Sequence, residues 1–268
     1  MWIDSHCHLD ASEFGGESLA VAQAAAQAGV SAIVVPAVHK SNFDTVIKLG
    51  EHRADCFYAL GIHPMYVPTS KEEDLLLLRE KVSELMAGAD TQRKLVAIGE
   101  IGLDYFVPAL TQSPLKEKQE CFYVEQLKLA RDFDLPVLLH VRRSQDIILK
   151  HLRRINVMGG IAHAFNGSQQ QAQTFIDMGF KLGFGGAMTF PRALQIRRLA
   201  TELPLSAIVL ETDSPDIPPS WLPEGVNTPA QLPRIGAVLA GLRNLSLAEV
   251  AEATTVNAMH IMPRMQRA

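Results

Sequence analysis

Two histidines near the N-terminus, in the opening MWIDSHCHLD, are the residues whose type and spacing most clearly suggest chemistry. His6 and His8 are separated by a single residue. If this segment is a strand, residues two apart point to the same face, so the two imidazoles project side by side. Such a pair can bind a metal ion, although an isolated pair with this spacing is more often part of a surface turn.

Other residue types that bind metals follow later apolar runs. Glu100 closes KLVAIG, His140 closes LPVLL, His163 closes GGIA and Asp213 closes SAIVLET. Taken alone, each histidine has an ordinary explanation as a satisfied core side chain, and each carboxylate as a helix cap or an ion-pair partner. Their meaning depends on whether these runs are strands that end at one place.

The elements that must position these residues are visible as short apolar runs separated by longer amphipathic stretches, as in repeated strand–helix units around a parallel sheet. The runs predicted as strands are 2–8, 31–37, 56–64, 94–102, 135–141, 159–165, 180–186 and 206–213. The helices predicted between them are 17–29, 41–53, 71–88, 115–133, 144–156, 168–179 and 190–204. Ser168 begins the Ser-x-x-Gln of a capping box, and a helical tail is expected from about Thr228.

This layout predicts an α/β fold, a (β/α)8 TIM barrel in a single domain over residues 1–268 with a C-terminal helical tail. The alternative is an open doubly wound sheet, but no Gly-x-Gly-x-x-Gly follows the first run. In a barrel, the C-terminal ends of all strands meet at one face. The candidate metal ligands that converge there are His6, His8, Glu100, His140, His163 and Asp213.

This mixed set of imidazoles and carboxylates is too large for one four-coordinate catalytic ion, which keeps a position open for water. It predicts two divalent ions, roughly 3.5 to 4 Å apart, with Glu100 as the bridge because a carboxylate has two oxygens. The expected ligand sets are His6, His8, Glu100 and Asp213 for one ion and Glu100, His140 and His163 for the other. Imidazole with carboxylate favours Zn, Mn, Ni or Co over Mg.

Composition narrows the class of protein. The chain has 268 residues, of which 47% are apolar and 20% are charged, with a net charge of -4, so a broad surface for coating nucleic acid is not expected. No signal peptide and no membrane span are predicted, which favours a cytoplasmic protein. The cysteines Cys7, Cys56 and Cys121 lack CxxC spacing, so neither a disulfide framework nor a zinc knuckle is expected.

Several candidates lie in short motifs along the chain. In order, these are DSHCHLD at 4–10, GIHP at 61–64, GEIGLDY at 99–105, PVLLHVR at 136–142, ETDSP at 211–215 and NTP at 227–229. Together they resemble the TatD family of metal-dependent hydrolases and deoxyribonucleases, on its YjjV-like branch, from residue 2 to about residue 260. The resemblance implies a TIM barrel, two divalent ions and hydrolysis, with phosphodiester substrates for some members. Nuclease members often carry a basic residue where this chain has Val226.

Two residues are expected to take part in the chemistry besides the bridge. A water between two ions is the expected nucleophile, because bound metal lowers its pKa. Asp213 can accept the proton of that water while it ligates, a role that the resemblance supports. His63 is not needed as a ligand and is expected either to touch the substrate phosphate or leaving group, or only to pack in its loop.

The remaining candidates are substrate contacts. Arg142 can pair with a phosphate oxygen, or form an ion pair at the rim. Asp104 and Tyr105 are expected to form the wall of the pocket. Asn166 lies at a helix start, a place that suits anions.

These expectations favour a two-metal phosphodiesterase or deoxyribonuclease that acts on single-stranded or frayed DNA ends, of the 3'-5' exonuclease type. The Pro-rich stretch 214–233 would surround a pit that a terminal nucleotide can enter, and the acidic chain lacks a basic surface for duplex DNA. An amidohydrolase or lactonase acting on a small carbonyl substrate is the alternative, because the same site activates water for both. A metal-binding protein without activity is a third possibility, which the full ligand set disfavours. No obligate protein partner is evident.

Overall fold

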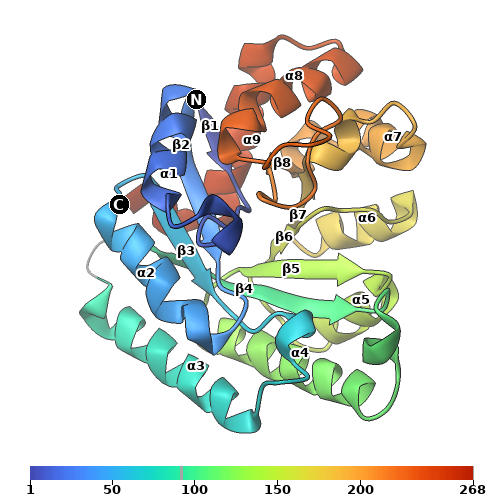
Figure 1. Ribbon diagram of the computed structural model, residues 1–268. Coiled ribbons are helices and arrows are strands. Elements are labelled where there is room, and N and C mark those ends of the chain that lie inside the picture. The colour runs from blue at the N-terminus through green and yellow to red at the C-terminus, as the bar shows by residue number, and fades with distance from the viewer. Residues whose placement is uncertain (91–92, 268) are drawn as a thin grey trace.

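The computed structural model describes residues 1–90 and 93–267, and its centre is a parallel sheet whose eight strands follow one another in chain order (Figure 1). The strands are β1 Trp2–Asp4, β2 Val30–Pro36, β3 Cys56–Leu60, β4 Leu95–Asp104, β5 Val137–Arg142, β6 Gly160–Ala162, β7 Phe180–Phe184 and β8 Ile208–Leu210. The backbone N–H of Ser5 donates to the carbonyl of Leu210 at 3.1 Å, and that of Asp213 to His6 at 2.9 Å. The last strand therefore meets the first, and the predicted barrel is confirmed.

Helices alternate with the strands and surround the sheet. They are α1 Ser18–Gln27, α2 Phe43–His52, α3 Glu72–Glu84, α4 Leu115–Asp132, α5 Gln145–Leu152, α6 Gln169–Asp177, α7 Leu194–Glu202, α8 Leu232–Arg243 and α9 Leu247–Ile261. Short helical turns follow several strands, among them η1 Ser12–Phe14, η2 Lys40–Asn42 and η3 Pro64–Tyr66. The capping box predicted at Ser168 is present, since Ser168 Oγ accepts from the N–H of Gln171 at 3.1 Å.

The C-terminal segment is more than a tail. Helix α8 packs against β1, β8 and α7, which is the place of the eighth outer helix of the barrel. Helix α9 crosses the N-terminal end of the barrel, where Asn257 Nδ2 donates to the carbonyls of Leu205 at 2.8 Å and Ile208 at 2.7 Å. Its last residue, Ile261, and the following Met262 close the barrel interior, because both pack with inward-facing strand residues. The predicted helical tail therefore consists of two helices with different roles: α8 is an outer helix of the barrel, and α9 covers its N-terminal end.

The inside of the barrel is filled by a layer of apolar side chains. The inward-facing residues that pack together, with those of α9, include Ile3, Val34, Phe57, Val96, Leu138, Ile161 and Val209. A second, larger cluster packs the outer face of the sheet against the helices, and it contains Cys7 and Cys56. Among the described residues, no helix is both long enough and apolar enough to cross a membrane.

Candidate metal centre

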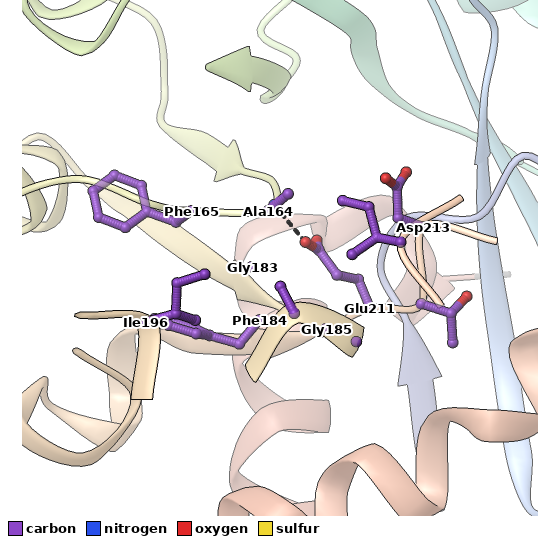
Figure 2. A pocket seen from close by; sticks show the side chains of 12 residues that line it. Ala164, Phe165, Gly183, Phe184, Gly185, Ile196, Glu211 and Asp213 are labelled. Carbon is purple, nitrogen blue, oxygen red and sulfur yellow. Dashed lines mark hydrogen bonds between the residues drawn. The ribbon is translucent and has the colours of Figure 1, made fainter. Parts of the chain in front are cut away.

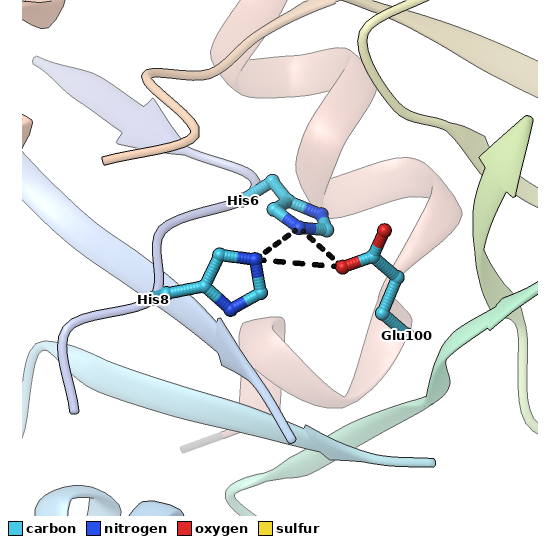
Figure 3. Close-up of side chains that lie close together, drawn as sticks. All are labelled: His6, His8 and Glu100. Carbon is cyan, nitrogen blue, oxygen red and sulfur yellow. Dashed lines mark hydrogen bonds and ion pairs between the residues drawn. The ribbon is translucent and has the colours of Figure 1, made fainter. Parts of the chain in front are cut away.

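His6 and His8 lie beyond the observed end of β1, which stops at Asp4, so the strand predicted over 2–8 is shorter than expected. The strand alternation breaks between Ser5 and His6, because the N–H of Ser5 and the carbonyl of His6 both bond to the β8 side. It resumes at Cys7, whose N–H donates to the carbonyl of Val34 on β2 at 3.1 Å. Both imidazoles face the same centre, with 3.4 Å between their Nε2 atoms (Figure 3).

Glu100, on β4, lies at the middle of this centre and is 1% exposed. Its Oε2 atom is 3.1 Å from His6 Nε2 and 3.5 Å from His8 Nε2. Its Oε1 atom faces the other histidines, at 3.0 Å from His140 Nδ1 and 3.1 Å from His163 Nε2. The two oxygens of one carboxylate therefore address two separate groups of imidazoles.

A glycine two residues after Glu100 allows β4 to approach β5 closely. Gly102 has φ +148°, a conformation that residues with a side chain rarely adopt. A Cβ atom at Gly102 would lie only 2.0 Å from the carbonyl oxygen of His140. Any larger residue there would push His140 away from Glu100.

Asp213 follows β8 and brings a second carboxylate to the centre. Its Oδ1 atom is 3.6 Å from His6 Nε2, 3.7 Å from His8 Nε2 and 4.0 Å from His163 Nδ1. The residue has φ +54°, in the left-handed region that aspartate tolerates better than most residues. Burial raises the pKa of Asp213, although the positive charges of His163 and His8 oppose this shift.

Asp4, which was not predicted as a site residue, holds the two ligand-bearing segments together. Its fully buried carboxylate accepts from the hydroxyl of Thr212 at 2.6 Å and from the Thr212 N–H at 3.0 Å. It also accepts from the N–H of His6 at 3.3 Å. Asp4 thus ties the segment after β1 to the segment after β8, and burial raises its pKa to about 7.

Glu211 was not among the predicted site residues, although it lies in the same ETDSP motif as Asp213. Its buried Oε1 atom accepts from the N–H of Ala164 at 2.5 Å and is 3.8 Å from His163 Nδ1 (Figure 2). The carboxylate lies over Gly183, where a Cβ atom would be only 2.1 Å from Oε2. A spacing of two residues would have indicated this position, since Glu211 follows the inward-facing Val209 as His163 follows Ile161.

Asp104, which was predicted as pocket wall and substrate contact, does line the cavity, but the residue is only 1% exposed and its carboxylate faces His140. The Asp104 Oδ2 atom is 3.1 Å from His140 Nε2, while Oδ1 accepts from the backbone of Phe106 at 2.8 Å. In its neutral form, His140 can donate from Nε2 to this carboxylate and offer the lone pair of Nδ1 on the side of Glu100. The neighbouring Tyr105 contributes no hydroxyl to the centre, because its OH donates to Glu120 on α4 at 2.7 Å.

His63 presents the opposite tautomer to the centre. Its Nδ1 atom accepts from the N–H of Met65 at 3.1 Å, and burial lowers the pKa of His63 to about 4. The neutral ring therefore carries its proton on Nε2, which is 3.3 Å from Glu100 Oε1. That His63 is not a ligand stays a prediction, because His63, Glu100 and His140 also lie close enough together to hold a metal ion.

A cavity of about 1270 Å³ opens above the centre. His63, Asp104, Arg142 and Asn166 are among its lining residues, together with Asp213. The Arg142 side chain is half exposed, and its Nη1 atom is 3.8 Å from Asp104 Oδ2. Residues 215–217 of the Pro-rich stretch form part of the wall, so this stretch does border the mouth as expected.

The buried carboxylates of the centre favour positive charge near the histidines, as the pKa values of these histidines show. Burial and the charge of His163 lower the pKa of His6 to about 3, which leaves its imidazole neutral and able to ligate. Burial also opposes protonation of His8 and His163, but Glu100 and Asp213 raise the pKa of His8 to about 9 and that of His163 to about 10. Divalent ions supply positive charge in place of such protons.

The donor set fits divalent ions. Three groups have ligand atoms that all lie within 4.8 Å of one another: His6, His8 and Glu100; His6, His163 and Asp213; and His63, Glu100 and His140. Two imidazole Nε2 atoms aimed at each other across 3.4 Å, with a carboxylate oxygen beside them, form a place where a cation relieves the repulsion of lone pairs. Imidazole and carboxylate together suit Zn, Mn, Ni or Co.

A family model, related sequences and a related crystal structure all point to the same protein family. The family model described as TatD related DNase matches residues 3–263. The uncharacterized metal-dependent hydrolase YjjV of Escherichia coli is 41% identical over 257 residues, covering 96% of this chain and 95% of that protein. The crystal structure of YjjV, a TatD homolog from Escherichia coli, superposes with a TM-score of 0.90 at 40% identity over 98% of each chain. Human deoxyribonuclease TATDN3 is 29% identical, over 98% of this chain and 95% of its own length.

Proposed function

The chain belongs to the TatD-related DNase family of metal-dependent hydrolases, and from this membership we propose that it is a two-metal phosphodiesterase that removes nucleotides from the 3' end of single-stranded or frayed DNA. The observation that carries the two-metal part is the orientation of Glu100. One of its oxygens faces His6 and His8, and the other faces His140 and His163. A carboxylate that addresses two ligand groups in this way is suited to bridge two ions.

His6, His8, Glu100 and Asp213 would hold one ion, and Glu100, His140 and His163 the other. Bound there, divalent ions supply charge to the phosphoryl oxygens and lower the pKa of water. Asp213 Oδ1 then accepts a proton from the attacking water, because it is the carboxylate oxygen that borders both His6 and His163. Asp104 holds His140 from behind through a hydrogen bond, and Glu211 places its negative charge 3.8 Å from Nδ1 of His163.

His63 completes the chemistry from the other side of the cavity. Its Nε2–H donor is fixed by the hydrogen bond that Nδ1 accepts from Met65, so it points to the centre without a change of tautomer. This donor stabilises the negative charge that develops on the leaving oxygen of the phosphodiester. Arg142, half exposed at the rim, supplies positive charge for a substrate phosphate.

Action at chain ends follows from the depth of the site and the charge of the chain. The centre lies at the bottom of a cavity walled by loops, where a continuous duplex does not fit but a terminal nucleotide does. The net charge of -4 leaves no excess of cations to coat duplex DNA, so positive charge has to be local.

Purified protein loaded with Mn or Zn should be assayed on linear single strands, blunt duplexes and closed circles. Single strands labelled at the 5' end should give a ladder of products shortened one nucleotide at a time, and blunt duplexes should react more slowly. Cleavage of closed circular DNA would contradict action at ends. Rapid hydrolysis of lactones or amides without any cleavage of DNA would instead place the enzyme with small carbonyl substrates.

A further inference from the structure

The two sides of the cavity mouth carry opposite charges. Asp10 and Glu13, which follow β1, and Asp216, which follows β8, line one side. Arg142 and Arg143, at the end of β5, line another side. A polyanionic strand leaving the metal centre is therefore repelled by the β1–β8 side and attracted by the β5 side.

The backbone brings the two arginines to one ring. Adjacent residues of a strand point to opposite faces, so Arg142 and Arg143 would diverge if β5 simply continued. Arg143 instead has φ +56°, in the left-handed region that a residue with a long side chain rarely adopts. The centre of the Arg142 guanidinium lies 3.8 Å from the centroid of the Phe106 ring, and that of Arg143 lies 4.7 Å from it.

The side chains around this ring leave positive charge free for a ligand. Phe106 is 45% exposed, although it is a large apolar residue. The carboxylate that pairs with Arg142 is that of Asp104, at 3.8 Å, and the same Oδ2 atom is already hydrogen-bonded to His140. Within residues 1–90 and 93–267, no carboxylate lies within 4.0 Å of the Arg143 guanidinium. The ring thus holds two guanidinium groups in place without neutralising them.

We propose that Phe106, Arg142 and Arg143 form a second phosphate subsite, which binds the phosphodiester next to the one being hydrolysed. This inference rests on the proposed function. A guanidinium offers a planar fork of N–H donors that matches phosphate oxygens, and stacking on an aromatic ring orients it before the substrate arrives. The subsite makes the enzyme selective for oligonucleotides over substrates with a single phosphodiester, and it directs the strand over the β5 side of the mouth.

The experiment compares a dinucleotide with one phosphodiester and no terminal phosphate with a single strand of ten nucleotides, using the metal-loaded enzyme. Arg143→Ala should lower kcat/KM for the ten-nucleotide strand about tenfold more than for the dinucleotide, mainly through KM. The slope of log KM against log salt for the longer strand should fall by about 0.7, the value for one phosphate contact on single strands. Arg143→Lys should keep most of that slope, because the charge remains.

Arg153→Ala is the matched control, since Arg153 is an exposed arginine at the far end of α5 and is absent from the cavity lining. Phe106→Leu should weaken discrimination between the two substrates in the same direction as Arg143→Ala. Equal losses on both substrates, or an unchanged salt slope in Arg143→Ala, would overturn the subsite while the proposed DNA hydrolysis stands. If the parent enzyme hydrolyses neither substrate, the proposed function and the subsite both fall.

Discussion

The two ends of the barrel use the same inward-facing positions for opposite purposes. On three strands, an apolar residue of the barrel interior is followed two positions later by a titratable residue of the mouth. The pairs are Leu138 and His140 at β5, Ile161 and His163 at β6, and Val209 and Glu211 at β8. One step of the pleat, roughly 6 to 7 Å along a strand, thus separates a core that excludes charge from a centre that concentrates it.

The comparison shows how the barrel accommodates a costly site. Buried titratable groups destabilise a fold unless they are paired, and at the mouth they are paired with one another. The opposite end is closed by α9, whose Ile261 extends the apolar interior together with the following Met262. Stability and chemistry are therefore expected to respond to different substitutions, even on a single strand.

The largest effect is expected at the mouth, from Asp213→Asn. The amide can still offer an oxygen to a metal but cannot accept a proton near neutral pH, so kcat should fall by at least about 100-fold. The thermal unfolding midpoint should change little, because Asp213 is outside the apolar interior. Steady-state kinetics at full metal occupancy measures this, and activity within a few-fold of the parent would remove Asp213 as the base.

On β6, Ile161→Ala should show the reverse pattern. Ile161 is fully buried in the barrel interior, and its truncation should lower the free energy of unfolding by about 2–5 kcal/mol. Metal content and kcat at 25 °C should stay near those of the parent, because the ligand His163 lies two residues after Ile161 and is not itself changed. Urea unfolding and elemental analysis test this together. A stable variant that loses metal would show that interior and mouth are not separable.

An intermediate effect is expected from Asp104→Asn. The amide weakens the hydrogen bond that fixes His140 with Nδ1 toward Glu100, so metal affinity should fall by about 10- to 100-fold. Metal titration of the apoprotein gives the measurement. Tyr105→Phe is the control, since it removes only a hydroxyl that donates to Glu120. Equal affinities in both variants would deny Asp104 a positioning role.

The smallest effect is expected from an ion pair beside the mouth that has no chemical role. Asp74, at the start of α3, accepts from Lys40 Nζ at 2.6 Å and from the Lys71 N–H at 2.9 Å. Burial alone would raise the pKa of Asp74, but these hydrogen bonds leave it below its ordinary value of 3.8. Asp74→Asn should lower the free energy of unfolding at pH 7 by less than about 1 kcal/mol, because the Lys40 side chain is 40% exposed and solvent screens the pair.

The sign of the pH dependence tests this pair further. Because the pKa of Asp74 is lower in the folded state, its stabilisation is present above pH 3.8 and is lost as the pH falls through the folded pKa. The difference between parent and Asp74→Asn should therefore be constant from pH 7 to pH 5 and shrink below pH 3.8. Urea unfolding at several pH values measures it, and a difference that grows in acid would contradict the assignment.

The sequence by itself determined the order of the strands and the types of the ligands. Eight apolar runs with helices between them specify a barrel, and a barrel brings strand ends to one face whatever their separation in the chain. The barrel topology alone therefore predicts that residues as distant as His6 and Asp213 share one centre.

Only the tertiary structure decided how these groups face one another. Tertiary contacts decide which way each Glu100 oxygen points. They also decide which imidazole nitrogen faces the centre, because Asp104 bonds one nitrogen of His140 and the Met65 N–H bonds one nitrogen of His63. No local pattern encodes these contacts. Asp4 and Glu211 acquire meaning only through burial against partners about 208 and 47 residues away. Arg143 reaches the Phe106 ring because of one left-handed backbone angle. The physical reason is that local periodicity determines the face of a strand on which a residue lies, whereas the chemistry of the site depends on distances between side chains of different strands.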